Sequence, residues 1–92
     1  MILDEVAAIA RAIELPVGWG FLLLAGEPDR ILVTEHEGLT AIWIATVMPD
    51  SRVVQAPLYI EPTDAPVDVL ERAAIVVTAM RRAVKAQAAR WN

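Results

Sequence analysis

The chain has 92 residues, of which 57% are hydrophobic and 22% are charged, and its formal net charge at pH 7 is −4. This length predicts one domain over residues 1–92, and the acidic balance argues against a surface built to bind nucleic-acid phosphates. Cysteine is absent, which excludes disulfides and thiolate chemistry.

The same sequence predicts where the protein resides. Its longest apolar run, residues 17–26, is far shorter than the roughly 20 residues that a membrane-spanning helix needs. Near the N-terminus, Asp4 and Glu5 stand where a signal peptide would need basic residues. We therefore expect a cytoplasmic protein that does not enter a membrane.

The first predicted element is a helix over residues 4–15. Ile2, Val6, Ile9 and Ile13 recur at spacings of three and four, which draws one apolar stripe along a helix. The sequence Pro-Val-Gly at residues 16–18 then predicts its end.

Four segments that follow are predicted to form an antiparallel meander. Turn residues separate them at Gly26–Asp29, His36–Gly38 and Met48–Ser51. Pro57 lacks a backbone N–H donor, so the fourth strand should be an edge, end early or carry a bulge. The predicted strands span residues 19–25, 31–35, 39–47 and 53–60.

A second, longer helix is predicted after residues 61–66. Thr63 or Asp64 can cap it, and Pro66 fits a first turn whose N–H groups are unpaired. About 24 helical residues would reach roughly 36 Å, so we expect the C-terminal end to overhang the sheet. Its predicted inward stripe is Leu70, Ala73, Val77, Met80, Val84 and Trp91.

These elements define the predicted fold class. We expect a single small α+β domain ordered α-β-β-β(-β)-α, with an antiparallel meander sheet packed by a long C-terminal helix. An antiparallel sheet with one solvated face should alternate apolar and polar residues, and this one alternates poorly. The sequence therefore predicts a second apolar sheet face.

Hairpins that pair symmetrically about the three turns would gather the aromatic and alanine residues on one face, which we assign to the core. That set is Trp19, Phe21, Leu23, Ile31, Val33, Leu39, Ala41, Trp43, Ala45, Val54, Ala56 and Leu58. The opposite face is then more aliphatic than a monomer usually exposes. On the second helix, Ile75 points away from the predicted inward stripe. The predicted partner-binding residues are Leu22, Leu24, Leu32, Ile42, Ile44, Val53, Tyr59 and Ile75.

Three occupants of that second face stay open. A helix of the same chain could cover it, a second copy could cover it in a homodimer, or a different protein could dock there.

The residues offer little for catalysis. His36 is the only histidine, Ser51 the only serine and Lys85 the only lysine, and a nucleophile–base arrangement needs groups that converge. Glu35, His36 and Glu37 could suggest a metal site, but adjacent strand residues diverge, and a charged hairpin tip explains them better. We expect no enzyme, no metal and no cofactor.

The order helix–strands–helix resembles that of double-stranded-RNA-binding domains. Those domains present basic residues at the start of the second helix, where this chain has Asp64, Asp68 and Glu71. We therefore do not expect nucleic acid as a partner.

The leading hypothesis is a non-enzymatic interaction module that docks on, masks or inhibits a partner protein, or self-associates, through an apolar sheet face. The profile is similar to that of small acidic secretion chaperones, of phage-encoded inhibitors of host defence complexes such as anti-CRISPR proteins, and of phage structural components. The alternative is a small-molecule-binding protein with an aromatic pocket between sheet and helices. That pocket would be lined by Trp19, Phe21, Trp43 and Tyr59.

Overall fold

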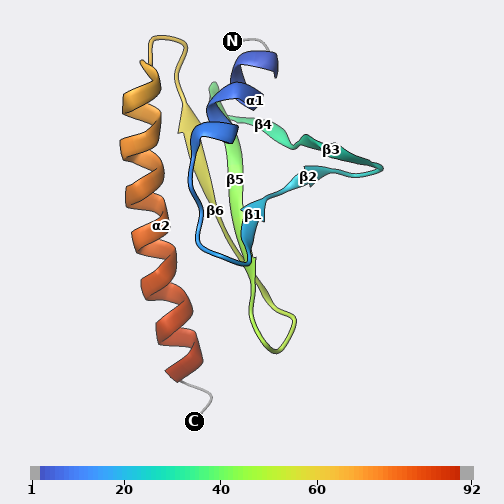
Figure 1. The fold of residues 1–92 in the computed structure, drawn as a ribbon, viewed down its shortest axis with the longest axis vertical. Coiled ribbons are helices and arrows are strands. Elements are labelled where there is room, and N and C mark those ends of the chain that lie inside the picture. Colours follow the sequence, from blue (N-terminus) through green and yellow to red (C-terminus); the bar gives the residue numbers. More distant parts are fainter. Residues whose placement is uncertain (1–2, 90–92) are drawn as a thin grey trace.

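The computed structural model describes residues 3–89, and Figure 1 shows two helices packed against an antiparallel sheet from which a hairpin projects. The predicted fold class is confirmed. Ile2 and Trp91, the terminal members of the two predicted helix stripes, lie outside the described residues. The elements are α1 (Leu3–Ala12), β1 (Trp19–Phe21), β2 (Leu23–Leu24), β3 (Glu27–Ile31), β4 (Val33–His36), β5 (Leu39–Val47), β6 (Val53–Ile60) and α2 (Pro66–Ala89).

The sheet is organised around β5, which is paired along both edges. On one side it pairs with β6 from Thr40 to Val47, and on the other side it pairs with β1 and β4, placed end to end. The predicted first strand, residues 19–25, is thus divided between β1 and β2. The Leu22 N–H donates to the Trp43 carbonyl at 2.9 Å, and the Leu32 N–H donates to the Leu22 carbonyl at 2.9 Å. These two bonds mark the point where the β2–β3 hairpin leaves the sheet.

The facing of β5 corrects the sequence prediction. Ile42 pairs with Val33 on one side and with Leu58 on the other, so all three side chains lie on the same face of the sheet. The prediction from symmetric turns puts Ile42 on the face opposite Val33 and Leu58. Ile42 and Ile44 are both fully buried in the core. Ala41 and Trp43, which were assigned to the core, therefore belong to the other face.

The error lies in two loop lengths. The β4–β5 turn has two central residues, Glu37 and Gly38, with φ of 53° and 79°, as a type I′ turn requires. Residues 48–52 form a five-residue β5–β6 loop, with Ser51 at a φ of 71°. The prediction assumed a three-residue and a four-residue turn. Each predicted turn differs from the observed loop by one residue. The first difference reverses which face the side chains of β5 point to, and the second reverses the effect again for β6. The predicted facing is therefore wrong for β5 and correct for β6.

One core joins the sheet to both helices. From α1 it takes Val6 and Ala10, and from α2 it takes Val69, Ala73 and Met80. Both helices therefore cover the same face of the sheet. The buried sheet residues in this core are Ile42, Ile44, Leu58 and Ile60, with Trp19, Phe21, Ile31, Val33, Val54 and Ala56 packed against them.

The helix stripes agree closely with prediction. Ile9 in α1 and Ile13, which directly follows α1, pack against the core beside Val6. In α2, Val69 is buried, whereas the predicted Leu70 is 38% exposed, so the inward stripe is rotated by one residue near its start. The first turn of α2 is also held differently, because the Ala65 N–H donates to the Asp68 carboxylate at 2.9 Å. The predicted cap by Thr63 or Asp64 is not observed, because neither side chain accepts a hydrogen bond from an N–H of the first turn of α2.

The buried facing of Ile42 predicts a large loss of stability on truncation. We expect Ile42→Ala to lower the free energy of unfolding by about 2–5 kcal/mol, because the side chain is fully buried between strands and helices. Urea unfolding measures this. The matched control, Val53→Ala at a 53% exposed position, should cost about 1 kcal/mol or less. Equal losses for the two variants would show that the assigned facing of β5 is wrong.

Candidate functional site

The face of the sheet turned away from both helices carries an apolar surface. Alternation from the core residues places Leu22 and Leu32 on it, together with the odd-numbered residues of β5 and β6. Leu39, Val47 and Val53 are 38%, 63% and 53% exposed, and neither helix packs over them. We call this surface the open face; its main residues are Leu22, Leu32, Thr34, Leu39, Ala41, Trp43, Val47, Val53, Pro57 and Tyr59.

Trp43 lies at the centre of the open face and is held there by a hydrogen bond. Its indole Nε1–H donates to Thr34 Oγ1 at 2.8 Å, and that hydroxyl donates in turn to the Ala41 carbonyl at 3.4 Å. The polar edge of the indole is thereby satisfied within the protein, and the remaining ring is presented as apolar surface. An aromatic side chain fixed in this way loses little conformational entropy when a partner covers it.

A shallow hollow adjoins Trp43. Ala41 is fully buried and has a small side chain, so larger neighbours rise around it. Thr34 and Tyr59 are its cross-strand partners on either side. The hollow has a volume of about 300 Å³ and is lined by Thr34, Glu35, Ala41, Trp43 and Tyr59. It has room for one apolar side chain of a partner.

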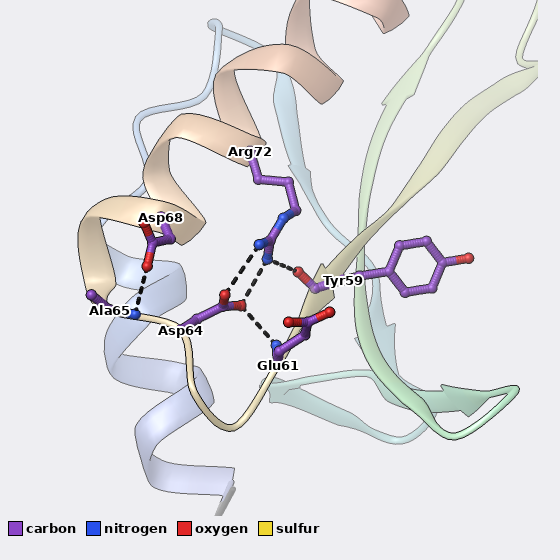
Figure 2. Close-up of polar contacts among 6 residues, drawn as sticks. All are labelled: Tyr59, Glu61, Asp64, Ala65, Asp68 and Arg72. Atoms are coloured by element: carbon purple, nitrogen blue, oxygen red, sulfur yellow. Dashed lines mark hydrogen bonds and ion pairs between the residues drawn. The ribbon is translucent and has the colours of Figure 1, made fainter.

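A half-buried ion pair positions the end of β6 that carries Tyr59. Arg72, from α2, donates Nη1 to Asp64 Oδ2 at 2.7 Å and Nη2 to Asp64 Oδ1 at 3.1 Å. Its Nη1 also donates to the Tyr59 carbonyl at 2.7 Å, and the Glu61 N–H donates to Asp64 Oδ2 at 2.7 Å. Figure 2 shows this network on the helix side of β6, with the Tyr59 ring directed the other way, toward the open face. The network therefore fixes the backbone from which Tyr59 projects.

The outer edge of β6 is protected, so the open face is the more accessible binding surface. The Trp43 carbonyl accepts a hydrogen bond from the Leu22 N–H, on the side of β5 that is away from β6. Because the direction of the backbone groups alternates along a strand, the other odd residues of β5 also direct theirs away from β6. Their partners Pro57 and Tyr59 then direct theirs to the outer edge. Pro57 has no N–H to offer, and Arg72 occupies the Tyr59 carbonyl. Strand addition along this part of the edge is disfavoured, and Pro57 occupies an edge strand as predicted.

The structure divides the predicted partner-binding residues among four places. Leu22, Leu32, Val53 and Tyr59 lie on the open face. Ile42 and Ile44 lie in the core, so their prediction as surface residues is wrong. Leu24 belongs to the projecting hairpin, where it lines a hollow of about 400 Å³ beside α1. Ile75 is 70% exposed on α2.

Sequence reasoning missed the central residue of the open face, Trp43, and also Leu39 and Val47. The signal that could have found them is the dipeptide Glu37-Gly38, because a two-residue hairpin turn ending in glycine sets the register that turns Trp43 outward. The four aromatic residues assigned to one ligand pocket are likewise separated. Trp19 and Phe21 pack on the core, while Trp43 and Tyr59 lie on the open face.

The chain was compared with family models, curated proteins and solved structures, and none of them matches it. Among residues 3–89, no helix combines the length and the apolar character needed to cross a membrane. Within the same described part of the chain, no three acidic, histidine or cysteine side chains gather as metal ligands would. The side chain of His36 lies outside what the structure describes.

The ion pair predicts a specific pH dependence of stability. The hydrogen bond from Arg72 holds the pKa of the Asp64 carboxyl below its ordinary value, and the Glu61 N–H acts in the same direction. A carboxyl whose pKa is lower in the folded state stabilises the protein fully above its unfolded-state pKa. That stabilisation is lost as the pH falls from the unfolded-state value through the folded-state value.

We therefore expect Asp64→Asn to lower Tm at neutral pH. The difference in Tm between this variant and the unchanged protein should become smaller as the pH falls through that range. Differential scanning calorimetry across the acid range measures the difference. Asp29→Asn, at an exposed position of strand β3, is the control and should leave Tm nearly unchanged. A Tm difference between Asp64→Asn and the unchanged protein that is independent of pH would contradict the assignment.

Proposed function

We propose that this chain is a non-enzymatic interaction module that binds a partner protein through the open face. The observation that carries the proposal is Trp43, which is anchored to Thr34 by its indole nitrogen and lies at the centre of an uncovered apolar sheet face. Buried aromatic anchors at the centre of an interface commonly supply most of its binding energy.

The shape and chemistry of the open face favour a protein over a small molecule as the ligand. Small-molecule sites are concave and enclose most of the ligand. Here the apolar residues Leu39, Val47 and Val53 are spread along the strands, and the hollow beside Trp43 is shallow. Gln55 is an exposed polar residue on the open face, and Glu35 lines the hollow. Polar positions around an apolar centre are typical of protein interfaces.

In this proposal the protein acts by occupying a surface of its partner. It would serve as an adaptor, a masking protein or an inhibitor, including the phage-encoded and secretion-chaperone classes with which its composition agrees. The lack of cysteine fits a reducing compartment such as the cytoplasm. The proposed partner is a different protein, and a second copy on the open face is the competing outcome of the experiment below.

The test places a photo-crosslinking amino acid at Val53, on the open face, in extracts of the native host. We expect one discrete adduct, and we expect Trp43→Gln to reduce its yield at least about tenfold, because loss of a central aromatic anchor costs on the order of 2 kcal/mol of binding. The Tm of Trp43→Gln should change little, since Trp43 does not pack against the core.

The control places the same crosslinker at Val17, which is fully exposed in the loop between α1 and β1. It should give no discrete adduct. An adduct of twice the 10.0 kDa chain mass at Val53 would assign the open face to a second copy. The proposal fails if Val53 yields no adduct, or if Trp43→Gln leaves the yield unchanged.

A further inference from the structure

The outward side of α2 carries a second surface, separate from the open face. The inward side of this helix buries Val69, Ala73 and Met80. At 100° per residue, a row of residues spaced by three and four lies diametrically opposite them. We call this row the outer strip of α2; it consists of Asp68, Glu71, Ile75, Thr78, Arg82 and Lys85, all exposed.

The outer strip is ordered by charge along the helix. Asp68 and Glu71 are acidic, Ile75 and Thr78 are uncharged, and Arg82 and Lys85 are basic. The same segregation holds for the whole sequence, in which all twelve acidic residues lie at or before Glu71 and five of the eight basic residues follow it. Acidic residues at the start of a helix and basic residues at its end interact favourably with the helix dipole. The dipole does not explain why Ile75, midway between the charges, is 70% exposed.

The middle of the outer strip has the shape of a helix-packing site. Ala74 and Ala79 flank Ile75 and Thr78, and their small side chains leave a hollow of about 320 Å³. The spacing from 68 to 71, 75, 78, 82 and 85 alternates three and four residues, which is the repeat by which two helices pack side by side.

We propose that a second copy of this chain packs its α2 antiparallel against the outer strip, about a two-fold axis midway between Ile75 and Thr78. In that register Ile75 faces the partner's Thr78, Glu71 faces the partner's Arg82, and Asp68 faces the partner's Lys85. Two-fold symmetry repeats each pair, so every charge of the outer strip meets its opposite. A parallel arrangement would set like charges against each other.

Self-pairing is favoured over another partner because the outer strip is complementary to itself without any adjustment. An antiparallel copy satisfies the acidic end, the apolar middle and the basic end together, and it uses one surface for both subunits. Since the pairs are exposed ion pairs around a small apolar centre, the dimer should weaken as salt rises.

The experiment measures self-association of the full chain by sedimentation velocity at low salt and at about 1 M salt, where the Debye length is ~3 Å. We expect a dimer at low salt and a Kd at least about tenfold weaker at high salt. Arg82→Glu should be monomeric at low salt, because a carboxylate then faces the partner's Glu71 in each of the two symmetric pairs. Glu71→Arg should be monomeric for the converse reason.

Charge exchange separates this interface from any other. An equal mixture of Arg82→Glu and Glu71→Arg should form a heterodimer, and the double variant Glu71→Arg/Arg82→Glu should dimerise again as a single species. Arg30→Glu, the same charge change on the exposed β3 strand, is the matched control and should dimerise like the unchanged chain. Trp43→Gln should also dimerise, because the open face lies across the sheet from α2.

The proposal is overturned if the unchanged chain is monomeric at low salt, or if Arg82→Glu still dimerises. It is also overturned if neither the mixture nor the double variant restores association while circular dichroism shows all variants folded. Dimerisation lost in Trp43→Gln but retained in Arg82→Glu would move the contact to the open face and overturn the proposal equally.

Discussion

β5 is hydrogen-bonded along both edges, and this double pairing determines the rest of the molecule. A strand held on two sides cannot rotate, so each of its residues has one fixed facing. Ile42 and Ile44 face the helices and form the middle of the core, while Ala41 and Trp43 face the opposite way. The position of both helices, the location of the open face and the direction of the Tyr59 ring all follow from that one orientation.

The two sides of β5 differ in chemistry as well as in exposure. The core side is aliphatic, which lets α1 and α2 approach closely, and the open side presents Trp43 with its nitrogen already bonded to Thr34. Because the open face and the outer strip of α2 lie on opposite sides of the protein, pairing through α2 would leave both open faces uncovered and directed apart. Such a dimer would be bivalent, and a partner that displays two copies of its site would bind it with increased avidity.

Local patterns predicted the elements well, because helix and strand periodicity depends on neighbouring residues. The stripe through Val6, Ile9 and Ile13 and the edge position of Pro57 are examples. The facing of β5 was not predicted, since it depends on whether one residue belongs to a strand or a turn. Glu37 and Ser51 adopt positive φ although neither residue type favours it. The network of Asp64 and Arg72 joins a loop, a helix and a strand whose approach no local pattern encodes.

The two loops that flank β5 constrain how such a sequence can diverge. The side chains of a strand alternate between faces, so one residue gained or lost in the Glu37-Gly38 turn would exchange the aliphatic and aromatic sides of β5. A single insertion in residues 48–52 would invert β6 instead, unless a bulge absorbed it. Insertions and deletions in these two loops should therefore be tolerated when they change the length by two residues or when a bulge compensates for them. The exposed β2–β3 hairpin is not under this constraint.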